Sequence, residues 1–351
     1  MHRRNLVRVL LLALLPGACS QSENHPASSR HVRIGREGGA LDIGEGAVTL
    51  TVPAGALNRD LDLTIVVGRS TPLTGWLDIG FCYEFGPPTT VFATPADLVL
   101  PYDPTRLSAA VDLGEFRVAH RDAAGGVRVF PATFVDPDGF HVGASVSELG
   151  TWWVVVPDVV SAAALWPLNH GDQYRYDSGL ELAIARTTTE PNLGGQSVIK
   201  VTLRQGGTES GLYFDDSQGL ARWGEFASTW QEISATPSLW LAPRDGIGVV
   251  RPTAGVYSGY TPFGSTRVAY EGSVGTVAEI LERVPVTVPR GSYGAVRVVI
   301  TVAFRDTRPQ QGEERLELWL VEGIGPVALR IGPQSAPVQR LVAATVGGRD
   351  V

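Results

Sequence analysis

Short runs in which apolar and polar residues alternate recur along most of the chain. Val48, Leu50 and Val52 fall on one face of an extended segment, while Thr49 and Thr51 fall on the other. This period of two is typical of a half-buried strand. Turns rich in Gly and Pro separate such runs as far as Val156, and we find no helical pattern of three turns among them. The pattern predicts an antiparallel β-sandwich over residues 36–157.

The second half of the chain has longer strand-like runs. Residues 295–304 and 314–321 are the clearest, because Val296, Val298 and Ile300 alternate with more polar neighbours. Such runs indicate largely buried antiparallel strands. We therefore expect a linker over residues 158–165 and a second antiparallel β domain over residues 166–351, which makes the protein all-β. A helical turn is expected only within residues 218–226.

The N-terminus has the pattern of a secretory signal. Three arginines lie within the first eight residues, and residues 9–15 form an uninterrupted apolar run, VLLLALL. That run is too short to span a bilayer, which needs about 20 residues. We therefore predict a signal peptide over residues 1–18 and a polar tether over residues 19–35.

The residues around Cys19 resemble the lipobox of bacterial lipoproteins, in which this cysteine is lipidated and becomes the mature N-terminus. Cys19 follows Gly17 and Ala18, but Pro16 stands where the motif has Leu. The alternative is ordinary signal-peptidase cleavage and a free secreted protein. Ser20 is similar to the sorting pattern for the outer membrane. The resemblance implies a protein anchored in the outer membrane by an N-terminal lipid and facing the periplasm or the cell surface.

The composition argues against one class of partner and indicates the role of the second cysteine. The net charge is −7 and we find no dense cluster of Lys or Arg, so we expect no nucleic-acid partner. Only Cys19 and Cys82 are present, so lipidation of the first leaves the second without a disulfide partner. A buried packing role is favoured for Cys82 over a reactive thiol, because a nucleophilic cysteine needs a nearby base.

Several segments of the first half resemble the ZU-five domain, the β-sandwich of ankyrins, netrin receptors and tight-junction scaffolds. They are GGALDIGEGAVTLTVPAGAL, YEFGPP (83–88), VFATPADLVLPYD (91–103) and the region that ends in SELGTWWVV. The resemblance implies a protein-interaction module. Some members cleave themselves at a His-Phe-Ser sequence, but residues 148–150 here are Glu-Leu-Gly, so we expect an uncleaved chain.

The C-terminal half resembles uncharacterised bacterial lipoprotein β domains. The similar segments are the opening LWPLxxGDxYxY (165–176), VPVTVPRGSY (284–293) and LWLVEGIGPV (318–327). The resemblance implies a long, curved antiparallel sheet. Some curved-sheet envelope lipoproteins hold lipid or other apolar ligands on the concave side, which is an analogy of fold only.

We find no motif that carries catalysis or holds a metal or cofactor. The histidines lack metal-ligand spacing, and nucleophile-elbow and phosphate-loop motifs are absent from the sequence. The carboxylate pairs Asp136/Asp138 and Asp215/Asp216 are interpreted as solvated turns. We therefore expect a non-enzymatic protein without cofactor or metal, although an enzyme whose residues converge only in space stays open.

Tryptophans are the remaining candidates for a binding surface. Trp166 and Trp319 are expected in the core, whereas Trp223, Trp230 and Trp240 are candidate interaction or ligand residues. Two hypotheses follow. The first is an interaction or scaffold module for another, unidentified envelope protein. The second is a carrier of a lipid-like apolar ligand, which requires a concave face that side chains do not fill.

Overall fold

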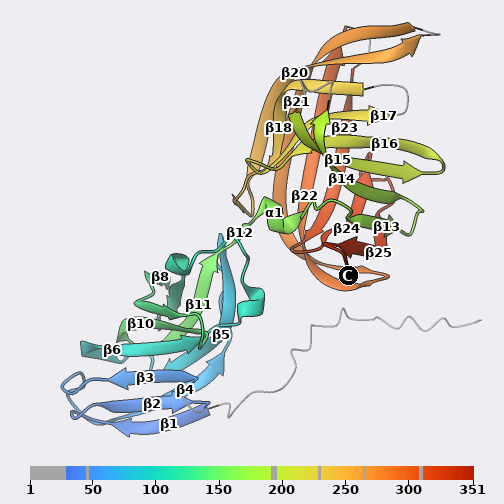
Figure 1. The fold of residues 1–351 in the computed structure, drawn as a ribbon. Coiled ribbons are helices and arrows are strands. Elements are labelled where there is room, and N and C mark those ends of the chain that lie inside the picture. The colour runs from blue at the N-terminus through green and yellow to red at the C-terminus, as the bar shows by residue number, and fades with distance from the viewer. Residues whose placement is uncertain (1–28, 45–46, 191–195, 228–230, 264–265, 308–310) are drawn as a thin grey trace, which may run out of the picture.

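The computed structural model describes residues 29–44, 47–190, 196–227, 231–263, 266–307 and 311–351. The protein is all-β, as expected, with 68% of residues in strands and 3% in helices. Figure 1 shows two units joined by one short connection, a sandwich and a barrel.

The first unit is a sandwich of two antiparallel sheets. One sheet has, in spatial order, β1 (Ser29–Ile34), β4 (Leu61–Gly68), β5 (Trp76–Gly86), β11 (Thr151–Pro157), β7 (Arg117–Arg121) and β8 (Val127–Pro131). The other has β2 (Gly39–Ile43), β3 (Val48–Val52), β6 (Val91–Pro101), β10 (His141–Glu148) and β9 (Phe134–Asp136). Two 3-10 turns, η1 (Pro104–Arg106) and η2 (Leu113–Glu115), precede β7.

The inward residues of both sheets form one apolar core. Leu50 and Leu98 come from one sheet and Ile65 and Phe85 from the other, and each is at most 1% exposed. The alternation seen in the sequence therefore corresponds to an inner and an outer face. One expected boundary is wrong: the sequence predicts a tether over residues 19–35, but residues 29–34 form β1, which pairs with β4.

The second unit is a closed barrel of twelve strands. In order these are β13 (Gln173–Tyr176), β14 (Glu181–Glu190), β15 (Gln196–Gln205), β16 (Thr208–Asp215), β17 (Leu220–Ala227), β18 (Gln231–Leu241), β20 (Val250–Phe263), β21 (Thr266–Val288), β22 (Gly291–Asp306), β23 (Gln311–Val321), β24 (Gly325–Ile331) and β25 (Gln339–Val346). The pairing Tyr174↔Ala344 between β13 and β25 closes the sheet. The short strand β26 (Arg349–Asp350) folds back and pairs antiparallel with β25.

For this unit the structure bears out one expectation and contradicts another. The curved sheet expected from the sequence is indeed strongly curved, and it closes on itself. The helical turn expected within residues 218–226 is wrong, because β17 occupies most of that stretch and pairs with both β16 and β18.

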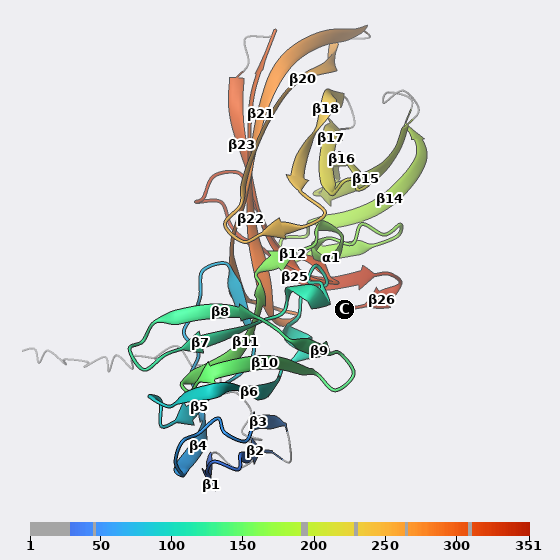
Figure 2. The same ribbon diagram turned by 90° about the vertical axis from the view of Figure 1, so that its left-hand side faces the viewer.

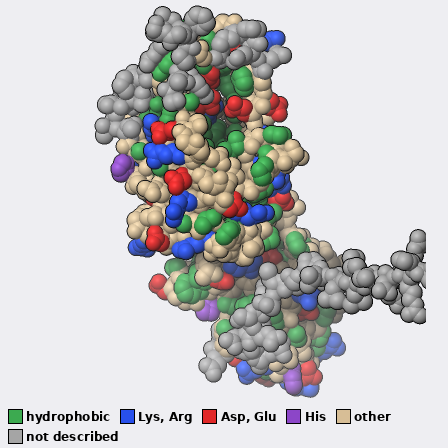
Figure 3. Space-filling view, turned by 90° about the vertical axis from the view of Figure 1, so that its right-hand side faces the viewer, with side chains coloured by type: hydrophobic (Ala, Val, Ile, Leu, Met, Phe, Trp, Pro, Cys, Tyr) green, Lys and Arg blue, Asp and Glu red, His purple; other side chains and the backbone are tan. Residues whose placement is uncertain are grey.

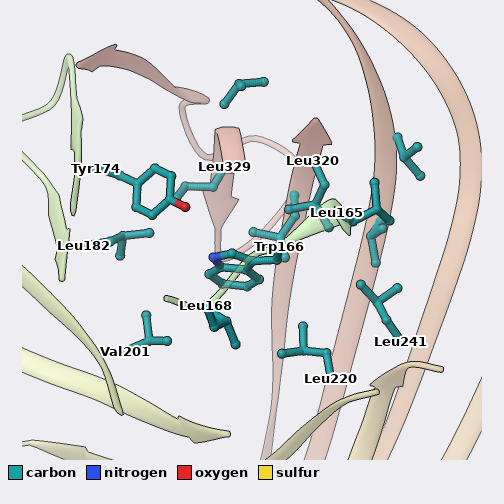
Figure 4. Packing of buried hydrophobic residues seen from close by; sticks show 14 of the residues in the cluster. Leu165, Trp166, Leu168, Tyr174, Leu182, Val201, Leu220, Leu241, Leu320 and Leu329 are labelled. Atoms are coloured by element: carbon teal, nitrogen blue, oxygen red, sulfur yellow. The ribbon is translucent and has the colours of Figure 1, made fainter. Parts of the chain in front are cut away.

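The segment that joins the two units fills one end of the barrel. After β12 (Val159–Val160), which pairs with β19 (Asp245–Gly246), the chain forms the single turn α1 (Ala162–Leu165) and continues through Leu168. Leu165, Trp166 and Leu168 are at most 4% exposed and lie among inward side chains of the barrel strands (Figure 4). A barrel of more than about eight strands is too wide for its own side chains to fill, so this segment completes the core.

Two tyrosines hold the filled end together. The Tyr174 and Tyr176 hydroxyls donate hydrogen bonds of 2.8 Å to the carbonyls of Ile324 and Pro326, in and after the β23–β24 turn. Gly325 lies between them with φ +99°, and a Cβ there would approach the Tyr174 hydroxyl to 2.7 Å. Glycine is therefore required for this close contact.

The sandwich meets the barrel around β12 and α1 (Figure 2), and ion pairs and a backbone contact join the two units there. Asp158 pairs with Arg283 of β21 at 2.8 Å, and Arg283 also donates to the Val159 carbonyl. Glu115 of η2 pairs with Arg244 at 2.6 Å. Residues 158–165, expected to be a linker, are thus an ordered junction that contacts both units.

No helix in the described ranges is long and apolar enough to cross a membrane.

Candidate binding cavity

The end of the barrel away from α1 is incompletely closed. β23 pairs with β22 over its length, but its pairing with β24 stops at Leu316↔Ile331. The described residues of β23 before Leu316 therefore have a strand neighbour on one side only. Figure 3 shows a hollow in this upper part of the molecule, with hydrophobic and acidic side chains beside it.

A cavity of about 470 Å³ occupies this region. Its walls come from β15–β18 on one side and from β22–β24 on the other, which are not neighbours in the sheet, so it lies across the interior of the barrel. Half of the sixteen lining residues are apolar, namely Leu203, Leu212, Phe226, Trp240, Ile300, Val302, Leu316 and Ile331. Five of the others are charged: Arg222, Glu225, Glu313, Glu314 and Arg315. The volume lies within the range of small-molecule sites, about 300–1,000 Å³.

A second cavity of about 240 Å³ adjoins the first. The two share the lining residues Arg222, Glu225, Val302 and Glu314. The smaller cavity is lined by carboxylates, hydroxyls and aromatic rings, including Glu232, Ser234, Tyr257, Tyr270 and Phe304. We call the first the apolar cavity and the second the polar cavity.

A β-bulge brings the shared charged pair inside the barrel. The pairing between β16 and β17 shifts after Tyr213↔Gly224 to Phe214↔Arg222, which leaves Trp223 unpaired in that ladder. Arg222 and Glu225 are three residues apart and would face opposite sides of a regular strand. The extra residue lets both share the inward face with Phe214.

Arg222 and Glu225 form a buried ion pair at 2.7 Å, with side chains 9% and 18% exposed. Burial raises the pKa of Glu225; Arg222 opposes this rise, and the nearby Glu314 charge adds to it. The Nε of Arg222 is buried and has no hydrogen-bond partner in the described part of the chain. A buried guanidinium N–H without an acceptor is costly, so this atom offers a strong donor to a bound group.

The tyrosines of the polar cavity are tied to acidic residues. Tyr270 donates to Glu232 of β18, and Tyr257 donates to Asp306 of β22 at 3.3 Å. The two rings meet edge to face, with centroids 6.2 Å apart. These contacts fix aromatic faces beside carboxylates.

The predicted site residues fall at different places. Trp240 is 2% exposed, lines the apolar cavity and meets Phe214 edge to face at 5.0 Å. Trp223 is half-buried and lines neither cavity; it packs against a small cluster of Val198, Tyr213 and Phe226, of which Phe226 also lines the apolar cavity. Trp230 and Cys19 lie outside the described residues.

Sequence reasoning missed the charged residues of the cavities. A signal was present for Glu314, because Leu316, Leu318 and Leu320 alternate on the inner face of β23 and the same register puts Glu314 on that face. At Arg222 and Glu225 the bulge interrupts the alternation, so the sequence does not show that both residues face inward.

The other singled-out residues have local structural roles. The pKa of Cys82 is raised by burial to about 12, which keeps the thiol protonated. Asp136 accepts hydrogen bonds from the backbone of its own turn, and Asp216 pairs with Arg186. No group of three metal-ligating side chains occurs among the described residues.

The buried His120 belongs to the sandwich core. Its ring stacks on Trp152 with centroids 4.0 Å apart, and Nε2 lies 3.4 Å from the Leu149 carbonyl. Burial lowers the pKa of His120. Gly150 lies against this ring, since a Cβ there would be 2.6 Å from Nε2.

No family model and no curated protein matches the chain. Among solved structures it is similar to one described as "a putative lipoprotein from Parabacteroides distasonis", with 10% sequence identity and a TM-score of 0.21 over 50% of this chain and 94% of that chain. A TM-score this low carries no argument about fold or function. The ZU-five assignment therefore stays a prediction, although the two-sheet sandwich is the architecture it implies.

Proposed function

We propose that the protein is a non-enzymatic cell-envelope lipoprotein whose barrel binds a lipid-like amphiphile. One observation carries the binding part: the barrel is packed solid at one end and hollow at the other. Inward positions near α1 hold large apolar side chains, whereas the far end encloses the apolar cavity. Apolar surface left around a cavity favours a ligand that covers it.

The shape of the apolar cavity supports a ligand over a protein partner. A protein-interaction module needs an exposed apolar patch, whereas this apolar surface is recessed between β15–β16 and β22–β24. A slender chain can enter such a space and a folded surface cannot.

A fluorescent apolar probe tests this part of the proposal. The chain from Ser20 onward, which contains every described residue, is titrated with 1-aminoanthracene. We expect saturable binding that Leu316→Trp abolishes by filling the apolar cavity. Ser273→Trp, on the exposed face of β21, is the matched control and should bind normally. Equal binding by both variants would contradict the assignment of the site.

The anchoring part of the proposal rests on the N-terminal pattern around Cys19. Lipidation would hold the carrier at the membrane, because each buried CH₂ contributes about 0.8 kcal/mol and a lipoprotein has several acyl chains. Cys19→Ala should move the protein from the membrane fraction to the soluble fraction. Retention in the outer membrane would contradict lipid anchoring.

The sandwich supports a second candidate function, docking to another envelope protein. Phe134 begins β9 and Phe140 ends the turn between β9 and β10, and they are 49% and 44% exposed. In-cell crosslinking of a protein with Phe134→Ser and Phe140→Ser tests it. Loss of a specific crosslinked partner would support docking, and an unchanged pattern would contradict docking through this hairpin.

A further inference from the structure

The two cavities share the charged residues Arg222, Glu225 and Glu314 but differ around them: aliphatic side chains line much of the apolar cavity, whereas Glu232 and two tyrosines line the polar cavity. This difference points to the head group of the ligand. This inference rests on the proposed function. The polar cavity is lined by three glutamates, Glu225, Glu232 and Glu314, and by one arginine, Arg222. Arg222 is already paired with Glu225, and among the described lining residues Glu314 supplies a negative charge that has no ion-pair partner.

Glu314 is the carboxylate most available to a ligand. It is exposed, it faces the cavities from β23, and it forms no hydrogen bond or ion pair with any described residue. It acts on Glu225 across the barrel as a like charge. A cation placed between β17 and β23 would relieve this repulsion, whereas an anion would add to it.

Aromatic faces next to these carboxylates favour the same kind of group. Tyr257, Tyr270 and Phe304 line the polar cavity together with Glu232. Ammonium groups bind well where carboxylates and aromatic rings meet, because the face of a ring attracts a cation. Carboxylates alone would suit a hydrated metal ion equally well.

Arg222 marks the place where the two cavities meet. It lines both, it is 8% exposed, and its Nε lacks an acceptor within the described ranges. A phosphate or ester oxygen at this position would accept that hydrogen bond. The indole Nε1 of Trp240, in the apolar cavity, is likewise buried without an acceptor.

We propose that the barrel selects a single-chain amphiphile with a zwitterionic head. The acyl chain lies in the apolar cavity, an acceptor oxygen of the head meets Arg222 Nε, and a terminal ammonium lies by Glu314 and Glu232 in the polar cavity. Each part of the amphiphile then lies beside side chains that suit it: the acyl chain beside aliphatic residues, the acceptor oxygen beside Arg222 and the ammonium beside glutamates.

Three lysolipid-like probes with the same palmitoyl chain test the inference: lysophosphatidylethanolamine, lysophosphatidylglycerol and monopalmitoylglycerol. Binding to the chain from Ser20 onward is measured by displacement of 1-aminoanthracene below the critical micelle concentrations. We expect the zwitterionic probe to bind at least ten-fold more tightly than the anionic one, with the neutral probe between them. The preference should shrink at high salt.

Glu314→Gln is the decisive variant, because this exposed side chain supports no described contact and its loss should leave the fold intact. It should bring the ratio of the two dissociation constants close to one. Glu271→Gln is the matched control, since Glu271 is exposed on β21 next to the inward Tyr270 and lines neither cavity. It should leave the ratio unchanged.

The outcomes separate the two proposals. Equal or tighter binding of the anionic probe, or a ratio that Glu314→Gln does not change, would overturn the head-group inference and leave the carrier function standing. Failure of 1-aminoanthracene and all three lipids to bind would overturn both.

Discussion

The sandwich and the barrel solve the same packing problem in different ways. In the sandwich, two sheets face each other, and their inward residues meet and exclude water. In the barrel, one sheet surrounds a lumen that twelve strands make too wide to fill. The joining segment around Trp166 fills one end, and nothing comparable from the described chain fills the other. Core formation thus leaves a cavity only where a second layer is missing.

The inward-facing residues of the sandwich and of the barrel differ accordingly in polarity. In the described part of the sandwich they are almost all apolar, and His120 is the buried residue there that can carry a charge. In the barrel, inward positions change along a single strand: β23 passes from Leu320 and Leu318 at the filled end to Leu316 and then Glu314 at the hollow end. Charged side chains are tolerated there because that end is not a dry core.

The largest expected effect comes from removing the residue that fills the barrel. Trp166→Ala should reduce the free energy of unfolding of the barrel by about 3–5 kcal/mol, through lost burial and the void left behind. Denaturant titration measures it. Trp319→Ala is the control. Trp319 was expected in the core, but it is only half-buried, packs against the same core cluster and has Arg330 over its ring, so its removal should cost less. Equal losses from both variants would contradict the role given to Trp166.

Two leucines on β23 compare the ends of the barrel directly. Leu320→Ala should cost about 2–5 kcal/mol, because Leu320 is fully buried in the filled end. Leu316→Ala should cost only about 1 kcal/mol, since its side chain already borders a cavity. Urea-induced unfolding of the two variants gives the comparison. A larger loss from Leu316→Ala would show that the hollow end is packed.

A smaller effect is expected at the junction. Asp158→Asn weakens the pair with Arg283, whose side chains are 17% and 29% exposed, and should cost about 1 kcal/mol. Differential scanning calorimetry should also show less coupling between the unfolding of the two units. Asp60→Asn, in a pair with Arg33 that is more than half exposed, is expected to change almost nothing. Similar thermograms for both variants would contradict a role of the Asp158–Arg283 pair in coupling the two units.

The last effect concerns pH and separates the sandwich from the barrel. Because the pKa of buried His120 lies below its ordinary value of 6.5, the folded sandwich binds this proton less readily than the unfolded chain. The stability it contributes is present above about pH 6.5 and is lost as the pH falls through the folded-state pKa. His120→Phe should flatten the dependence of the sandwich's melting temperature on pH between 7 and 5. An unchanged slope would exclude His120 as its source.

The alternation of apolar and polar residues predicted most of the strands, but it could not predict that the second sheet closes into a barrel. The alternation at Val296, Val298 and Ile300 identified β22, because both faces of a strand differ in burial. Closure depends on β13 and β25, two short strands about 170 residues apart whose pairing has no local signature.

The candidate site was predicted only at Trp240, for a similar reason. The bulge at Trp223 interrupts the period of two, so Arg222 and Glu225 look like residues of a helical turn in the sequence. Only the neighbouring strands β16 and β18 show that both face inward.

The most direct test of the central claim, that the hollow end of the barrel holds a ligand, is native mass spectrometry. The chain from Ser20 onward is purified gently from a bacterial periplasm and measured before and after extraction with organic solvent. We predict an extra mass of one amphiphile that extraction removes and that Leu316→Trp prevents. A mass equal to the polypeptide alone, in both the original protein and the variant, would contradict the claim.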